Sequence, residues 1–232
     1  MRTKLTLFFS LFITLSLFAQ WKPAGDKLKT EWASKIDVNN VLPEYPRPIM
    51  ERDSWQNLNG MWDYAILPRG NEMPKSFDGK ILVPFAIESS LSGVQKELGS
   101  KNELWYHREF TVPANWKSDR VLLHFGAVDW KADIWVNDIK VGQHVGGYTP
   151  FSFDVTSALK KGNNKLVVRV WDPTDDGYQP RGKQVNRPEG IWYTPVSGIW
   201  QTVWLEPVSD NFIENLKITP DIDKNILTVE AI

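Results

Sequence analysis

The chain has 232 residues, a formal net charge of -1, no cysteine, and a composition that is 42% hydrophobic and 24% charged. This length suffices for one large packed domain, or one and a half, and the composition excludes an intrinsically disordered protein. The near-zero charge excludes a broad basic surface, so nucleic acid is not an expected partner, and the absence of cysteine excludes disulfides and a lipoprotein anchor.

Residues 1–19 have the pattern of a secretory signal peptide. Arg2 and Lys4 precede an apolar run over residues 5–18, and the small residue Ala19 follows that run. The run is too short to span a bilayer, which leaves a buried N-terminal helix as the alternative. We therefore expect cleavage after Ala19 and an exported protein, periplasmic or extracellular, with no membrane association after cleavage.

The segment after the predicted signal peptide is rich in proline, asparagine and charge. Pro43, Pro46 and Pro48 lie close together, and each proline biases the residue before it toward an extended backbone. We predict an extended lead-in segment over residues 20–44, followed by one domain over residues 45–208.

Strand patterns begin at Gly60. Met61, Asp63 and Ala65 alternate with the larger side chains Trp62, Tyr64 and Ile66 until Pro68 and Gly70 end the run. A second apolar run covers residues 81–85, and a third strand over residues 105–112 is ended by Pro113. Further strands are predicted at residues 120–125, 132–136, 139–141, 151–155 and 165–171.

Asn137 and Asp138 separate two of these runs. Both residue types tolerate the positive φ that two-residue hairpin turns require, so residues 132–141 are predicted to form a β-hairpin.

The last strand pattern of the main domain starts at Ile199. Val203 and Leu205 would share one face of this strand, with Thr202 and Trp204 on the other. After a polar joint, strands are predicted at residues 212–219 and 226–232, with a turn between them, so residues 209–232 are expected to begin a second domain.

Many short strands separated by turn signals, with almost no helical periodicity, predict an all-β sandwich. Four tryptophans lie within the strand patterns, where a large ring contributes core area, and we expect them to be partly or wholly buried. These are Trp62, Trp135, Trp171 and Trp204.

Common catalytic patterns are missing from the sequence. It has no cysteine nucleophile, no Gly-x-Ser-x-Gly elbow and no phosphate-binding glycine loop, and His107, His124 and His144 are too far apart for a local metal motif. We therefore assign no catalytic residue, no metal ligand and no cofactor, and expect structural roles for His107 and His124, which lie within strand patterns.

Residues 172–189 form the best candidate for a functional surface, because long polar loops on rigid β scaffolds often carry binding groups. Side chains of this loop could hydrogen-bond sugar hydroxyls, and two aromatic rings just after it could stack on the apolar face of a pyranose. The candidates are Tyr178, Gln179, Arg181, Lys183, Gln184, Asn186, Trp192 and Tyr193. The alternative is a solvated loop without a ligand.

The same loop begins with clustered acids. Asp172, Asp175 and Asp176 raise the question of a calcium loop, but their spacing does not match that of an EF-hand. We expect an Asp-Pro turn with solvated carboxylates instead.

Two stretches carry a family resemblance. Residues 190–205, GIWYTPVSGIWQTVWL, and residues 136–153, VNDIKVGQHVGGYTPFSF, resemble the N-terminal sugar-binding domain of glycoside hydrolase family two, which comprises β-galactosidases, β-glucuronidases and β-mannosidases. The resemblance spans about residues 42–207. It implies a jelly-roll, galactose-binding-like β-sandwich, and it implies that residues 209–232 are the first strands of a truncated immunoglobulin-like domain.

The resemblance also implies a carbohydrate ligand and the hydrolysis of O-glycosyl bonds with retention. In that family two glutamates on a later β/α barrel, about 5 to 5.5 Å apart, perform the reaction. We expect this chain to lack the barrel and to be inactive alone. Where β-galactosidases and β-glucuronidases have an aspartate six residues before the Gly-Ile pair, this chain has Trp192. The alternatives are a free-standing carbohydrate-binding module and a non-carbohydrate adhesion sandwich.

Overall fold

A computed structural model describes residues 21–26, 28–117 and 119–232, so the predicted signal peptide lies outside the described residues. Among the described residues, helical structure is limited to short 3-10 turns, η1 (Glu31–Lys35), η2 (Ser90–Ser92) and η3 (Thr156–Ala158). None of the helices described is long and apolar enough to cross a membrane.

The described strands follow one another along the chain. They are β1 (Gln56–Asn57), β2 (Gly60–Pro68), β3 (Gly79–Val83), β4 (Asn102–Thr111), β5 (Arg120–Phe125), β6 (Val128–Asp129), β7 (Lys131–Val136), β8 (Ile139–Val145), β9 (Phe151–Asp154), β10 (Asn163–Trp171), β11 (Gly198–Ile199), β12 (Val203–Val208), β13 (Leu216–Asp221) and β14 (Ile226–Ala231). The longest connections lie between β3 and β4 and between β10 and β11.

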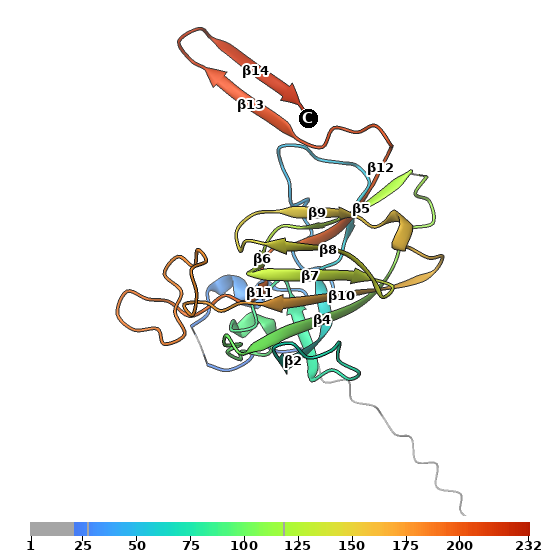
Figure 1. The fold of residues 1–232 in the computed structure, drawn as a ribbon. Coiled ribbons are helices and arrows are strands. Elements are labelled where there is room, and N and C mark those ends of the chain that lie inside the picture. Colours follow the sequence, from blue (N-terminus) through green and yellow to red (C-terminus); the bar gives the residue numbers. More distant parts are fainter. Residues whose placement is uncertain (1–20, 27, 118) are drawn as a thin grey trace, which may run out of the picture.

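Two antiparallel sheets pack face to face (Figure 1). One has the strand order β1-β12-β5-β9, and the other has the order β3-β2-β4-β10-β7-β8. The short strands β6 and β11 pair with each other. The predicted all-β jelly-roll sandwich is therefore confirmed.

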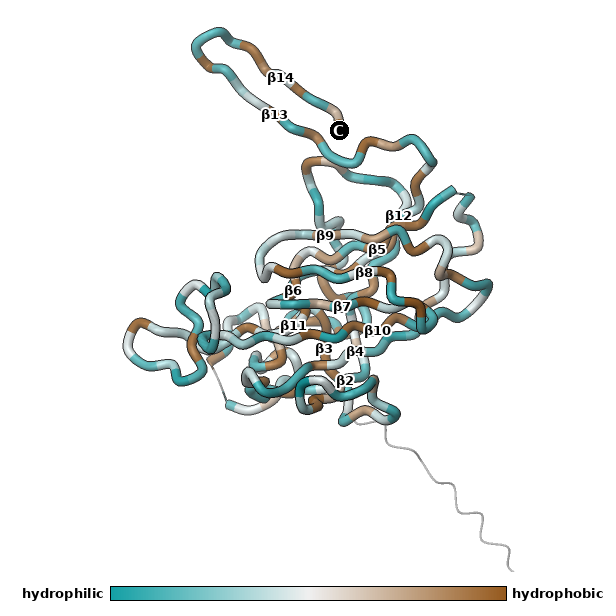
Figure 2. Tube along the Cα trace, in the orientation of Figure 1, coloured by the Kyte–Doolittle hydropathy of each residue, from teal (hydrophilic) through white to brown (hydrophobic). Residues whose placement is uncertain are grey.

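The core lies between the two sheets and is built by strand alternation. Trp62 and Tyr106 from the larger sheet and Leu123, Phe125 and Leu205 from the smaller one are buried in a single cluster. The hydropathy colouring in Figure 2 shows apolar and polar residues alternating along these strands. Of the four strand tryptophans, Trp62 and Trp204 are buried and the other two half-buried, as predicted.

The β7–β8 hairpin forms at the predicted turn. Asn137 and Asp138 have φ values of 50° and 68°. The Asn137 side chain also ties the turn to its neighbours, since its amide donates to the Ala158 carbonyl oxygen at 2.8 Å and its Oδ1 accepts from the Lys165 amide at 3.0 Å.

Replacing Asn137 with alanine should lower the free energy of unfolding by about 2 kcal/mol. The change removes these hydrogen bonds, and alanine tolerates the positive φ of this position less well than asparagine does. Chemical denaturation measures the loss. Asp138→Asn keeps a residue tolerant of positive φ and should change the free energy by less than about 0.5 kcal/mol. Equal losses in the two variants would contradict this account of the turn.

The strand predicted to run on from Ile199 is interrupted. β11 ends at Ile199 and pairs with β6, whereas β12 begins at Val203 and pairs with β5. The chain changes sheets between these strands, and the Trp200 amide donates to the Ala127 carbonyl oxygen at 3.2 Å. The predicted faces of β12 are confirmed, because Val203 lies in the main core and Trp204 stacks on His124 on the outer face of the sheet.

The hairpin β13–β14 projects away from the sandwich (Figure 1). The strand predicted for residues 212–219 begins only at Leu216, so the prediction was wrong at its start. Phe212 instead packs against the sandwich. The guanidinium groups of Arg52 and Arg120 each lie 5.5 Å from the centroid of its ring. Whether residues 209–232 begin a second domain stays a prediction.

Residues 45–52 connect the predicted lead-in segment to β1 and lie on the outer face of the smaller sheet. Their side chains reach Glu206 on β12, where the Arg47 and Arg52 guanidinium groups lie 2.9 and 2.8 Å from the carboxylate. This ion cluster ties residues 45–52 to the sandwich.

Candidate functional site

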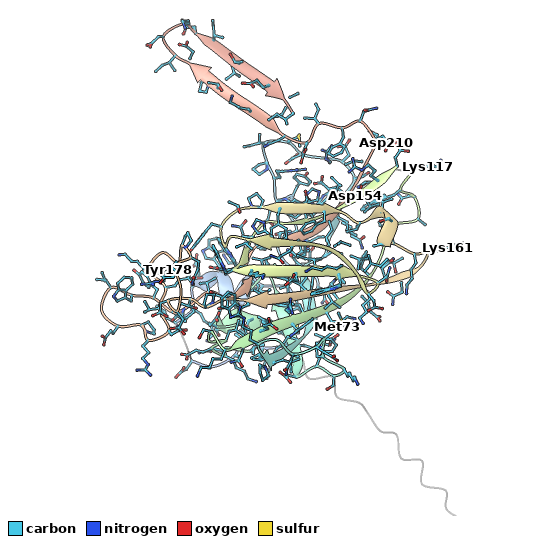
Figure 3. The ribbon with its side chains drawn as sticks, viewed as in Figure 1. Met73, Lys117, Asp154, Lys161, Tyr178 and Asp210 are labelled. Carbon is cyan, nitrogen blue, oxygen red and sulfur yellow. The ribbon has the colours of Figure 1, made fainter. Side chains whose placement is uncertain are left out.

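The candidate loop joins β10 to β11 and spans residues 172–197. It extends from one end of the sandwich, with Tyr178 far from the sheets (Figure 3). Two segments of the loop pair locally, since the Tyr193 amide donates to the Lys183 carbonyl oxygen at 2.8 Å and the Val185 amide donates to the Tyr193 carbonyl oxygen at 3.1 Å. Val185 is buried beneath this pairing. The loop is therefore an internally bonded unit.

Five of the eight predicted site residues present side chains at the loop surface. Tyr178 is fully exposed, Tyr193 is 65% exposed and Trp192 is 40% exposed. Lys183 is exposed as well, and the half-buried Arg181 places its guanidinium 5.7 Å from the centroid of the Trp192 ring. These residues combine aromatic faces with cationic donors.

The other three predicted residues hold the loop together. Gln179 donates to the Thr174 carbonyl oxygen, and the Asn186 amide donates to Asp175. Gln184 donates to the Tyr148 hydroxyl at 3.1 Å and accepts from the Val196 amide. Their polar groups are engaged in positioning the loop.

Asp172 corrects the expectation of solvated acids. Its side chain is buried at the start of the loop, where it accepts from the Thr174 amide at 2.7 Å and from the Ser197 hydroxyl at 2.6 Å. Asp175 is half-buried and Asp176 is exposed. The turn itself forms, but its first carboxyl joins the two ends of the loop.

Two further carboxyl groups lie buried beneath the loop. Glu88 accepts from the Ser197 amide at 2.9 Å, and Asp129 lies 3.4 Å from the Gln184 side-chain amide nitrogen. Neither was identified from the sequence, where the only signal was that each acid follows an apolar residue in a short hydrophobic stretch. None of the acidic and histidine groups described forms a cluster of three suited to a metal ion.

Burial dominates the protonation of these groups. It raises the pKa of Glu88 and that of Asp129 to about 7 each, with a further contribution from the charge of Asp172. Burial also raises the pKa of Asp172, although its hydrogen bonds from Ser197 and Thr174 oppose this.

This burial predicts a pH-dependent stability. Carboxyls of an unfolded chain ionise near pH 4, whereas those of Glu88 and Asp129 keep their protons in the fold up to about pH 7. Between these values the folded chain binds more protons, so the free energy of unfolding should fall as the pH rises from about 5 to 8. Denaturation midpoints across this range measure the slope, and Asp129→Asn should flatten it.

Glu72→Gln is the matched control, because Glu72 is exposed on a loop. It should leave the pH profile as it is. A profile that rises steadily from pH 5 to 8 would contradict the assignment of raised pKa values to the buried acids.

A groove of about 740 Å³ lies between the loop and the turn before β4. One wall is the segment from Glu97 to Asn102, and the other includes Asn186 and Trp192. The Ser100 hydroxyl donates to Asp176 at 2.5 Å and thereby joins the two walls.

The comparisons with known proteins agree on one family. The family model described as "Glycosyl hydrolases family 2, sugar binding domain" matches residues 55–206. A β-galactosidase of Thermoanaerobacter pseudethanolicus is 35% identical over 171 residues, which cover 71% of this chain and 22% of that protein. A β-glucuronidase of Paenibacillus borealis is 25% identical, with 77% of this chain and 33% of that protein covered. The chain thus spans a third or less of the length of these relatives.

Solved structures give the same fold. A β-glucuronidase from an uncultured Clostridium sp. superposes with a TM-score of 0.55 at 23% identity and covers 75% of this chain and 33% of that one. A β-glucuronidase of Ruminococcus gnavus gives a TM-score of 0.57 at 21% identity, with 75% and 31% covered. The chain belongs to glycosyl hydrolase family 2, through the sugar-binding domain of that family.

Proposed function

We propose that this chain is the N-terminal, sugar-binding and scaffolding part of an exported glycosidase that removes a terminal sugar with retention. The observation that carries the proposal is the match of residues 55–206 to the family's sugar-binding domain, in a chain that covers only 22% and 33% of two relatives with glycosidase names. In this proposal the loop of residues 172–197 faces the substrate pocket of a catalytic domain.

The chemistry of the proposed reaction requires two carboxyl groups about 5 to 5.5 Å apart, one acting as acid and base and the other as nucleophile. The buried acids beneath the loop do not suit these roles, because Glu88 and Asp172 are buried and both accept hydrogen bonds from Ser197. We propose that the reactive pair belongs to a β/α barrel encoded after Ile232.

Export is supported by the charge and hydrophobicity pattern of residues 1–19. Expression of the intact gene followed by N-terminal sequencing tests it. Mature protein starting at Gln20 outside the cytoplasm is expected, and an unprocessed Met1 in the cytoplasm would contradict export.

A free-standing carbohydrate-binding module is the second candidate, favoured by the exposed aromatic rings of Tyr178, Trp192 and Tyr193. Titration calorimetry of the chain with galactosides, mannosides and glucuronides separates the two, since a dedicated module should bind alone with substantial heat, whereas the proposed glycosidase part should bind only weakly without its barrel.

The decisive test of the proposal is the coding sequence beyond the codon for Ile232. A barrel with two glutamates should follow, and in the protein so encoded Trp192→Ala should raise KM about fivefold or more, since stacking of an aromatic ring contributes about 1 kcal/mol. A downstream sequence without a barrel would refute the glycosidase, and an unchanged KM would remove the loop from the substrate site.

A further inference from the structure

The groove between the loop and the turn before β4 has the dimensions of a ligand site. Its volume of about 740 Å³ falls within the roughly 300 to 1,000 Å³ typical of small-molecule sites. Its lining includes the apolar side chain of Val185 and the ring of Trp192, which is 40% exposed. It therefore offers both an apolar surface and polar edges.

Both walls of the groove are fixed before any ligand arrives. In the first wall the Asn102 side chain donates to the Leu98 carbonyl oxygen at 2.7 Å, and the Trp171 indole donates to the Ser100 carbonyl oxygen at 2.8 Å. In the second wall Asp175 accepts from the Asn186 amide at 3.0 Å. A preformed site loses little conformational entropy on binding.

The chemistry of the lining matches that of a sugar. Trp192 can stack on the apolar face of a pyranose. The Lys101 and Arg187 cations can donate to sugar hydroxyls, and carboxylates such as that of Glu97 can accept from them. The Arg181 guanidinium lies over the Trp192 ring and holds its orientation without lining the groove.

The charge of the lining is negative. Four acidic side chains face two basic ones, a formal net charge of -2, and counting Arg181 still leaves an excess of acid. The acidic members are Glu97, Asp175, Asp176 and Glu189, and the basic members are Lys101 and Arg187. An anionic ligand would meet repulsion here, and a neutral one would not.

We propose that this groove binds a neutral saccharide and discriminates against uronic acids, a specificity that rests on the sugar-binding role proposed above. The discrimination comes from the acidic lining, and affinity comes from Trp192. The relatives include both a β-galactosidase and a β-glucuronidase. Of the two kinds of sugar, we expect this chain to bind the neutral one.

An NMR titration of the 232-residue chain tests the proposal with two matched probes, methyl β-D-galactopyranoside and its uronic acid counterpart, which differ only at C6. The galactoside should shift the indole N–H resonance of Trp192, assigned by its loss in Trp192→Phe. At about 10 mM ionic strength the uronate should bind about fivefold more weakly or worse, and about 0.5 M salt should narrow the difference.

Three variants complete the test. Trp192→Ala should abolish galactoside binding, whereas Tyr178→Ala should preserve it, because Tyr178 is exposed on the same loop outside the groove. Glu189→Gln should strengthen uronate binding about twofold or more relative to galactoside binding. Absence of galactoside binding, or uronate binding of equal or greater strength, would overturn the proposal. Neither outcome bears on whether a barrel is encoded downstream. The proposed glycosidase function is therefore tested independently of this binding proposal.

Discussion

Replacing Glu206 with alanine should lower the free energy of unfolding by about 3 kcal/mol or more, because it leaves paired cations of a buried cluster without their counter-charge. The carboxylate is fully buried and accepts from the Tyr45 hydroxyl at 2.5 Å, from the Trp204 indole at 2.7 Å and from the guanidinium groups of Arg47 and Arg52. Three of these four partners belong to residues 45–52, so the loss should also release that segment from the sheet. Urea denaturation with a tryptophan fluorescence readout measures the effect.

The pKa of Glu206 adds a second signature. Burial alone would raise it, but hydrogen bonds and charge from His124, Tyr45 and Trp204 outweigh burial and lower the pKa to about 2. The stability that this group contributes is therefore complete above about pH 4.5 and is lost as the pH falls toward 2. The Glu206→Ala variant should lack this acid-side loss.

Glu230→Ala is the matched control, since it breaks an exposed ion pair with Lys217 at 2.9 Å. Exposed pairs contribute about 1 kcal/mol or less, so this variant should be nearly as stable as the original chain. Equal losses in Glu206→Ala and Glu230→Ala would show that the buried cluster does not anchor residues 45–52.

Replacing Gly198 with alanine should cost about 4 kcal/mol, from a steric overlap and from backbone strain combined. A β-carbon at this position would lie 2.0 Å from the Tyr106 hydroxyl oxygen and 3.1 Å from a Leu104 methyl carbon, and the residue has a φ of 92°. The Tyr106 hydroxyl itself accepts from the Ile199 amide at 3.2 Å, so it cannot move away without losing that bond. Thermal and chemical unfolding measure the loss.

Two comparisons separate overlap from strain. Gly162→Ala has a similar φ of 86° with nothing within 4 Å of the new carbon, and should cost only about 1 to 2 kcal/mol. Adding Tyr106→Phe to Gly198→Ala should recover part of the loss, because it removes the overlapping oxygen. If Gly198→Ala lowers the free energy of unfolding by no more than Gly162→Ala does, the close contact between Gly198 and Tyr106 of β4 is contradicted.

Much of the sandwich could be predicted because strand alternation and turn chemistry are local properties. The runs around Trp62 and Tyr106 became β2 and β4, and the Asn137-Asp138 pair became the β7–β8 turn. The break after Ile199 could not be predicted, since it depends on which neighbouring strand each half meets across the sheet.

The sequence predicted the loop of the candidate site, but not the buried carboxyl groups beneath it. The sequence indicated exposed groups such as Tyr178 and Trp192, whereas the burial of Asp172 with Glu88 depends on Ser197 folding back beneath the loop. Similarly, Phe212 packs between arginines that are 160 and 92 residues earlier in the chain, counted from Arg52 and Arg120. Contacts of this kind are absent from any local sequence pattern.

The central claim is that the sandwich serves recognition and support, while the reactive carboxyls belong to polypeptide outside these residues. Incubation of the purified 232-residue chain with p-nitrophenyl β-D-galactopyranoside and with p-nitrophenyl β-D-glucuronide, followed by the absorbance of released p-nitrophenol, tests it most directly. We predict no release of p-nitrophenol above the buffer rate with either substrate. Turnover that disappears in Asp129→Asn or in Asp172→Asn would contradict the claim, because the chain would then cleave glycosides with its own side chains.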